Sequence, residues 1–206
     1  TRVYAPALPG FGGTAQLLSW RFSMEGYAAW VAAFCRVVKI GEPVILVGHS
    51  FGGGVAIRVA HDHPELVRAL VLVNSIGAAT ANRSLWDWGL HFPTDLIPLR
   101  QVTRVLPVVL EDAVPNLLRN PVAMWKVANL ARRADLTREL EVLRERRLPV
   151  VILWGDNDRI IPRPAFEALC AAAGTEGEVV NGNHSWLLAD PAALGEVMTN
   201  VVAVAR

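Results

Sequence analysis

The most informative stretch of the chain is Val44-Ile-Leu-Val-Gly-His-Ser-Phe-Gly-Gly-Gly54. Its apolar, β-branched start predicts a short buried strand, and its small residues after Phe51 predict the start of a helix. The turn between them reads Gly48-His-Ser-Phe-Gly52, a Gly-x-Ser-x-Gly pattern. A serine on a sharp strand-to-helix turn points its hydroxyl out of the sheet, and the glycines relieve the crowding that a Cβ would cause. The stretch therefore predicts that Ser50 is an exposed nucleophile beside the N–H groups that open the helix.

The composition indicates one compact domain with a large apolar core and room for a small insertion. The 206 residues are 52% hydrophobic and 19% charged, and the mean hydropathy is +0.32. A parallel sheet that is buried on both faces has this composition, because its strands are continuous apolar runs. The net charge of +1 gives no indication of a nucleic acid or an anionic membrane surface as partner.

The sequence contains no pattern for a disulfide, a metal or a membrane span. The two cysteines, Cys35 and Cys170, have no C-x-x-C or metal-type spacing, so we expect reduced thiols. No apolar run reaches the roughly 18 residues that span a bilayer, and the opening Thr1-Arg-Val-Tyr4 is not typical of a signal peptide. We therefore expect a cytoplasmic protein without a membrane span and without a metal or organic cofactor.

Strand and helix patterns alternate along most of the chain. Strands are expected at residues 2–6, 44–47, 66–74, 148–154 and 178–180, and helices at 23–38, 53–63, 164–173 and 191–204. Between residues 76 and 147 there is no strand run, and this part contains five prolines, namely Pro93, Pro98, Pro107, Pro115 and Pro121. The alternation predicts an α/β fold with a mostly parallel sheet and helices on both faces. Residues 1–76 and 148–206 then form the core, and residues 77–147 form a helical cap.

A serine nucleophile needs a base, and His184 is the best candidate for it. It lies in the polar loop Asn181-Gly-Asn-His-Ser-Trp186, after a short strand and before the last helix, where a side chain can point into a site. The other histidines fit other roles: His61 and His63 lie near the end of a helix, His91 lies in the cap, and His49 flanks the nucleophile as a structural or pocket-lining residue.

The base in turn needs an acid to orient it, and the loop Trp154-Gly-Asp-Asn-Asp-Arg-Ile-Ile-Pro162 offers two. Asp156 could be a turn former that hydrogen-bonds its own backbone, and Asp158 lies further along the same loop. The residues alone leave both open. Either choice gives the chain order Ser, Asp, His, which is the order of one of the known triad folds.

With these segments in place, the chain resembles the α/β-hydrolase superfamily, in its serine-nucleophile, capped branch. Leu8-Pro-Gly-Phe-Gly12 is similar to the turn after the family's fourth strand, and Asn183-His-Ser-Trp186 is similar to its histidine loop. The resemblance implies the α/β-hydrolase fold and a triad of Ser50, His184 and Asp158, since the last aspartate before the apolar pair is the family's acid. Phe51 N–H would be the first oxyanion-hole donor.

The sequence departs from the family pattern in three places. Ala7 stands where the turn usually has an aspartate, and Asn183 stands where a glycine usually precedes the histidine. The family's first strands, which carry the loop with the second oxyanion donor, have no counterpart here. We consider three explanations: the chain is a fragment, it is a short member that covers its exposed sheet edge as a homodimer, or amides of residues 10–13 replace the donor.

The resemblance implies a serine hydrolase, carboxylesterase-like (EC 3.1.1), that cleaves a small to medium, apolar carboxylic ester through an acyl-enzyme. The candidate residues of the substrate pocket are His49, Trp86, Trp125 and Trp186, although the cap tryptophans could simply pack the cap onto the core. The alternatives are a carbon–carbon bond hydrolase of the meta-cleavage type, a cofactor-free perhydrolase, or a binding protein with an incomplete oxyanion hole. The expected partner is a small-molecule ester.

Overall fold

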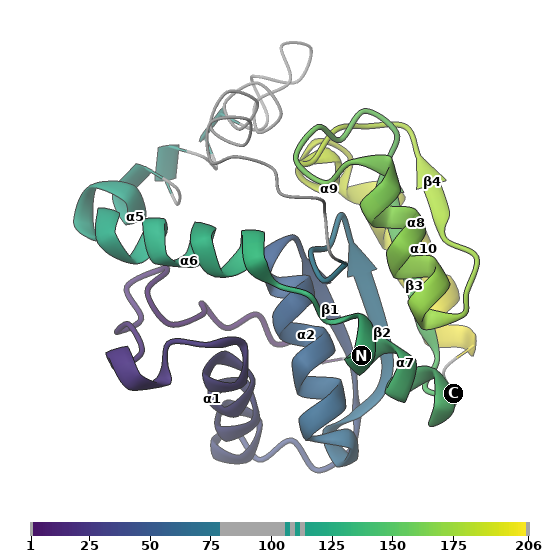
Figure 1. Ribbon diagram of the computed structural model, residues 1–206, viewed down its shortest axis with the longest axis horizontal. Helices are drawn as coiled ribbons and strands as arrows, with labels where there is room; N and C mark the ends of the chain where they lie inside the picture. The colour runs from purple at the N-terminus through teal and green to yellow at the C-terminus, as the bar shows by residue number, and fades with distance from the viewer. Residues whose placement is uncertain (1, 79–105, 108–109, 112–113, 205–206) are drawn as a thin grey trace.

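A four-stranded parallel sheet forms the centre of the computed structural model, which describes residues 2–78, 106–107, 110–111 and 114–204 (Figure 1). The strands lie side by side in chain order: β1 (Val44–His49), β2 (Val67–Val73), β3 (Val150–Gly155) and β4 (Glu178–Val180). Leu70, Val71 and Leu72 in β2 are fully buried, because both faces of this central strand are covered. The predicted α/β fold with a parallel sheet is confirmed.

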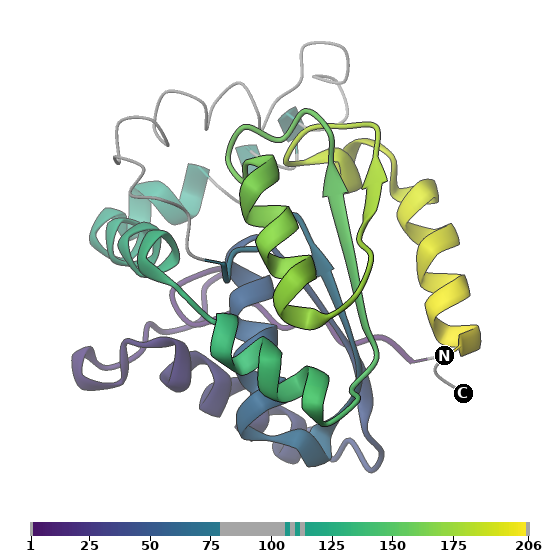
Figure 2. The same cartoon turned by 45° about the vertical axis from the view of Figure 1, so that its right-hand side comes forward.

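Helices cover both faces of the sheet (Figure 2). Each connection between neighbouring strands carries a helix, which is how parallel strands are joined. One apolar core contains residues of α1 (Met24–Val37), α2 (Phe51–Asp62), α7 (Thr137–Glu145) and α8 (Arg163–Ala173). A second, smaller core lies on the opposite face, under α9 (Trp186–Ala189) and α10 (Pro191–Val204). Single-turn 3₁₀ helices at Ser19–Arg21 and Pro64–Leu66 precede α1 and β2.

The guanidinium of Arg58 on α2 links three helices of the larger layer. It lies 2.9 Å from a carboxylate oxygen of Glu25 on α1, 2.7 Å from one of Asp62 on α2 and 3.0 Å from one of Glu139 on α7. A network of several charges fixes geometry better than an isolated surface pair. α7 is therefore held on α2, and it also packs against α8, although it lies within the range expected for the cap.

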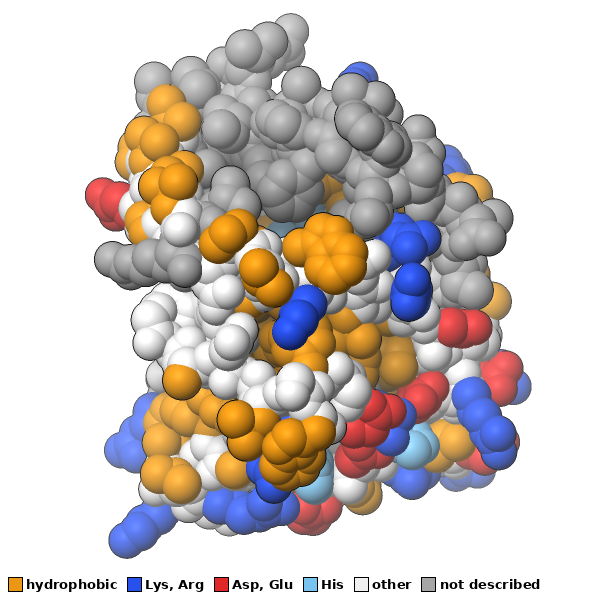
Figure 3. Space-filling model, turned by 60° about the vertical axis from the view of Figure 1, so that its left-hand side comes forward, with side chains coloured by type: hydrophobic (Ala, Val, Ile, Leu, Met, Phe, Trp, Pro, Cys, Tyr) orange, Lys and Arg blue, Asp and Glu red, His pale blue; other side chains and the backbone are white. Residues whose placement is uncertain are grey.

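The other described helices of the insertion are α5 (Val114–Arg119) and α6 (Pro121–Arg133). The side chain of Asn120 caps α6 by accepting the Ala123 N–H at 3.2 Å, and Pro121 occupies the first helical position. Figure 3 shows hydrophobic side chains at the surface on the face that carries these helices and the segment before α1. The exposed apolar residues there are Leu18, Trp20, Leu118, Val122 and Trp125.

β1 is the edge strand of the described sheet, and it borders a groove of about 780 Å³. The groove is also lined by residues from the segments 2–8 and 39–43, from α1 and from α10, and Val47 on β1 is 44% exposed. The strand expected at residues 2–6 is not present, because a strand is stabilised by a hydrogen-bonded neighbour and no described strand pairs with this segment. Within the described residues, no helix is both long and apolar enough to cross a membrane.

Candidate active site

Ser50 occupies a sharp turn between the end of β1 and the start of α2. Its backbone angles, φ 52° and ψ −120°, lie outside the regions that non-glycine residues normally adopt. Two hydrogen bonds anchor this conformation: its N–H donates to the Val73 carbonyl at 3.1 Å, and its carbonyl accepts the Ile76 N–H at 3.2 Å. A Cβ at Gly48 would lie 2.5 Å from the Gly52 carbonyl oxygen, so a side chain there would prevent the turn. Strain of this kind is stored at functional sites.

Asp158 is the acceptor at the centre of a buried hydrogen-bond network. Its Oδ1 accepts the backbone N–H groups of Ile160 and Ile161, both at 2.8 Å. Its Oδ2 accepts Nδ1–H of His184 at 2.8 Å and Nδ2–H of Asn74 at 2.5 Å. Asp158 is nearly inaccessible to solvent, so these four donors take the place of water around the carboxylate.

Asp156 has a different environment in the same loop. It is exposed, and its Oδ1 accepts the Gly182 N–H at 3.0 Å and the Asn157 side-chain amide at 2.7 Å. These bonds tie the loop after β3 to the loop that follows β4. Asp156 is therefore a loop-fixing residue, and Asp158 is the aspartate that contacts the histidine.

The imidazole of His184 is buried, and its contact with Asp158 assigns its tautomer. A carboxylate only accepts hydrogen bonds, so Nδ1 of His184 carries the proton and Nε2 is left as an acceptor. This is the form in which an imidazole can take a proton from a hydroxyl. His184 is positioned by the loop after β4, while Asp158 is positioned by the loop after β3.

His49 brings the histidine loop next to the turn that carries Ser50. Its Nε2 lies 2.8 Å from the carbonyl oxygen of His184, and the two rings are 4.8 Å apart. Since a carbonyl only accepts, Nε2 of His49 carries a proton. Burial, with the nearby His184 as a second cause, lowers the pKa of His49 to about 4. His49 is therefore neutral near pH 7 and acts as a fixed donor that holds the His184 backbone.

The N–H of Phe51 is the described candidate for an oxyanion donor. Phe51 is the first residue of α2, and the first N–H groups of a helix have no partner within the helix. The loop of residues 10–13 contributes less than expected, because the N–H of Gly10 donates to the Thr14 carbonyl and that of Phe11 to the Leu8 carbonyl. Two amides of that loop are thus used inside their own turn.

The pocket residues expected from the sequence lie in different places. Trp86 falls outside the described residues. Trp125 is on α6 and 61% exposed, while His49 is in the site as described. Trp186 is buried, and its indole N–H donates to Oδ1 of Asn74 at 2.7 Å. No group of three His, Cys, Asp or Glu side chains in the described parts of the chain could hold a metal ion.

Asn74 is the member of this network that sequence reasoning missed. It follows β2 directly, at the same edge of the sheet as Ser50 after β1 and Asp158 after β3. The signal was available, since polar residues at the carboxyl ends of neighbouring parallel strands meet at one edge. An asparagine after an apolar run is nevertheless also an ordinary turn residue, so its sequence position alone did not indicate a hydrogen bond to Asp158.

Comparisons with known proteins agree with this architecture. The sequence model of the alpha/beta hydrolase family matches residues 1–197. A 2-hydroxymuconate semialdehyde hydrolase of Pseudomonas putida is 37% identical over 183 residues, which are 80% of this chain and 63% of that protein. An uncharacterised protein of Mycobacterium tuberculosis is 28% identical over 226 residues, which are 95% of this chain and 66% of that protein. The chain thus spans about two thirds of the length of these relatives.

A solved structure extends the comparison to the fold. A hydrolase from Oleispira antarctica superposes with a TM-score of 0.77 at 12% sequence identity. The alignment covers 94% of this chain and 78% of that one. At this identity the likeness concerns the fold alone.

Proposed function

Because this chain belongs to the alpha/beta hydrolase family, we propose that it is a serine hydrolase that cleaves a small to medium, apolar carboxylic ester. Ser50 is the nucleophile, His184 the general base and Asp158 the residue that orients the base. The observation that carries the proposal is the buried Nδ1–H to Oδ2 contact of 2.8 Å between His184 and Asp158, tied by His49 to the strained turn at Ser50.

The reaction proceeds in two halves. Oγ of Ser50 attacks the ester carbonyl carbon while Nε2 of His184 takes the hydroxyl proton, and the negative charge on the former carbonyl oxygen faces the Phe51 N–H. The C–O bond to the alcohol then breaks, and His184 returns its proton to the departing alkoxide. Water, deprotonated by His184, attacks the acyl-enzyme, and the acid and free Ser50 are released.

The preference for an apolar acyl group rests on the described part of the insertion. Apolar side chains such as Trp125 and Val122 on α6 are exposed to solvent at 61% each. Contiguous exposed apolar surface marks ligand or partner sites more often than structural positions.

The likeness to a 2-hydroxymuconate semialdehyde hydrolase, at 37% identity, favours a second candidate, the hydrolysis of a carbon–carbon bond in a vinylogous diketone acid. The same three side chains serve that reaction in the sequence-based interpretation. The two candidates differ in the electrophile offered to Ser50, so substrate preference separates them.

The test is steady-state hydrolysis of p-nitrophenyl acetate, butyrate and octanoate beside 2-hydroxymuconate semialdehyde. We expect kcat/KM for the preferred ester to exceed that for the semialdehyde by at least about tenfold. The reverse preference would replace the ester proposal by the second candidate. A folded chain that turns over neither substrate and is not labelled by a fluorophosphonate would contradict a serine hydrolase altogether.

The open edge of β1 supports a homodimer in which two copies pair along this strand. An edge strand presents unpaired backbone groups, and most of the residues that line the adjoining groove are apolar. We expect Val47→Lys to shift the chain to monomers in sedimentation equilibrium, because a lysine would bring like charges together across the edge. The matched control is Val179→Lys on β4, which is 49% exposed against 44% for Val47 but lies at the opposite edge. A wild-type chain that stays monomeric at all concentrations contradicts the homodimer.

A further inference from the structure

We infer that Asn74 and Trp186 are a positioning pair that fixes the Asp158 carboxylate in the orientation in which it receives Nδ1–H of His184. The inference rests on the proposed function, since it concerns the same site. Neither residue is a member of the triad predicted from the sequence. Their contacts link the carboxyl end of β2, the loop after β3 and the start of α9 into one buried network.

The side chain of Asn74 is fixed by its own backbone before it meets either partner. Its N–H donates to the Leu153 carbonyl at 2.9 Å, which ties it to β3. Its φ of 45° lies in the left-handed region, which asparagine tolerates better than most residues. The side chain is 1% exposed. A buried amide of this kind needs hydrogen-bond partners, and the side chains of Asp158 and Trp186 provide them.

The orientation of the Asn74 amide follows from what Trp186 can do. An indole N–H only donates, so the Asn74 atom 2.7 Å from it must be the oxygen. The amide nitrogen is thereby turned toward Oδ2 of Asp158, at 2.5 Å. Trp186 thus determines which end of the amide the carboxylate meets, and Asp158 meets a donor.

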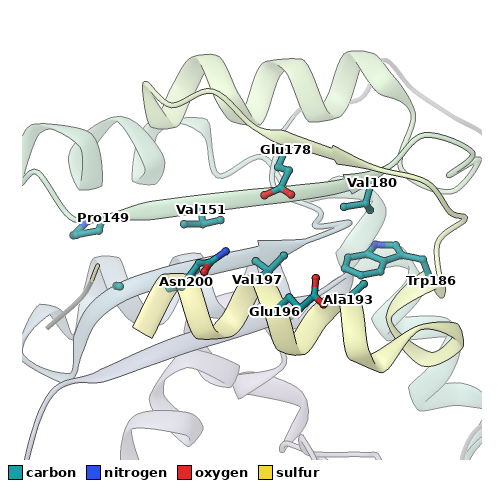
Figure 4. Close-up of a pocket in the computed structure, with 11 residues that line it drawn as sticks. Pro149, Val151, Glu178, Val180, Trp186, Ala193, Glu196, Val197 and Asn200 are labelled. Carbon is teal, nitrogen blue, oxygen red and sulfur yellow. The ribbon is translucent and has the colours of Figure 1, made fainter. Parts of the chain in front are cut away.

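The indole of Trp186 is held by the smaller apolar core: the residue is 3% exposed and belongs to the same buried cluster as Val73 and Leu153. Trp186 lies at one end of a cavity of about 410 Å³ between the sheet and α10, beside Val180 and Ala193 (Figure 4). A Cβ at Gly182 would lie 2.4 Å from the Cβ of Trp186, so the preceding loop also lies close against it. Because the ring is enclosed by neighbouring residues, the position and direction of its N–H are fixed.

The network leaves the Asp158 carboxylate no freedom to rotate. Two backbone amides occupy Oδ1, and Asn74 and His184 share Oδ2. Without the Asn74 amide, one lone pair of Oδ2 and the Trp186 N–H would both be buried without a partner. The carboxylate could then turn toward Trp186, and its contact with His184 would lengthen.

The test compares Asn74→Ala and Trp186→Phe with wild type in ester hydrolysis. We expect Asn74→Ala to lower kcat by about 10- to 100-fold, the usual effect of a lost hydrogen bond to a charged group, with KM within about twofold. Trp186→Phe keeps an aromatic ring at this position but removes the indole N–H together with part of the bicyclic ring, and it leaves the Asn74 amide in place. It should therefore lower kcat in the same direction by a smaller factor. It also keeps the inference testable if Asn74→Ala does not fold.

Two further variants separate positioning from loss of structure. Ser75→Ala removes a buried hydroxyl next to Asn74 that donates to the Ile76 carbonyl, and it should leave kcat unchanged. Asn74→Asp places a second carboxyl beside Asp158, with His184 and His49 beyond it. Two adjacent carboxyls share a proton at low pH and repel each other once both ionise. The kcat of Asn74→Asp relative to that of wild type at the same pH should therefore fall as the pH rises.

Proton NMR on the free protein measures the contact between His184 and Asp158 directly, without any substrate. The Nδ1–H of His184, bonded to Asp158, should give a low-field resonance that weakens in Asn74→Ala and Trp186→Phe but not in Ser75→Ala. Unchanged resonance and unchanged kcat in both variants would overturn the inference. If wild type shows the resonance but no hydrolysis, the proposed function fails. The resonance in Asn74→Ala and Trp186→Phe then still tests whether this pair positions Asp158.

Discussion

Replacing Ser50 by alanine is expected to lower kcat for a p-nitrophenyl ester by about 10⁴-fold or more and to abolish labelling by a fluorophosphonate. Ser50 is the residue whose strained backbone, φ 52° and ψ −120°, points a side chain out of the turn. Without its oxygen no acyl-enzyme forms, and any remaining hydrolysis comes from binding near the Phe51 N–H. Both readouts should be recorded on protein whose fold is checked by circular dichroism.

The size of the effect should not grow when His184 is replaced as well. Residues that act as a unit give strongly non-additive losses, so Ser50→Ala, His184→Ala and the double variant should have similar kcat values. The control is Ser185→Ala. Ser185 is a buried serine next to His184, and its hydroxyl has no hydrogen-bond partner among the residues that the structure describes. Labelling that survives in Ser50→Ala but disappears in Ser185→Ala would move the nucleophile to the histidine loop.

Much of the sheet could be predicted because each of its strands is a short apolar run between turn residues. The expected strand at 44–47 is β1 at Val44–His49, and the expected strands at 66–74 and 178–180 are β2 and β4. Each is a short apolar or β-branched run that ends at a glycine or an asparagine, so its own sequence contains the signal. The last helix, at 191–204, has the expected bounds for a related reason, since Pro191 marks its start.

Features that depend on residues far away in the chain could not be predicted from the local sequence. The apolar start of the chain, around Val3 and Tyr4, has the pattern of a strand, but pairing depends on a neighbour. α7 lies within the range expected for the cap, yet Glu139 binds Arg58 on α2. Asn74 shows the same limit in the site, because its partners Asp158 and Trp186 are 84 and 112 residues away along the chain.

The choice between Asp156 and Asp158 could be predicted only in part. Both follow an apolar strand, and the residues alone left the choice open. The family resemblance selected Asp158, and the structure supplies the physical difference, since Asp158 is buried and contacts His184 while Asp156 is exposed. This difference makes the second large effect testable.

Asp158→Asn is expected to lower kcat by about 10⁴-fold near neutral pH, although the side chain keeps its shape. The new amide can present its oxygen to the backbone N–H groups of Ile160 and Ile161, which now bond to Oδ1. Its NH₂ then faces Nδ1 of His184 and the NH₂ of Asn74, so donors face donors. His184 relieves this conflict by placing its proton on Nε2 instead of Nδ1. In that tautomer Nε2 cannot take the proton of Ser50.

Asp156→Asn is the matched control, because it makes the same chemical change two residues away. Its oxygen can still accept the Gly182 N–H, so we expect kcat within a few-fold of wild type and a small loss of thermal stability. The measurement is kcat for the same ester from pH 6 to pH 9 in both variants. A loss in Asp156→Asn that equals or exceeds the loss in Asp158→Asn would mean that the acid has been assigned to the wrong aspartate. The contact between Asp158 and His184 would then serve only to hold the histidine loop.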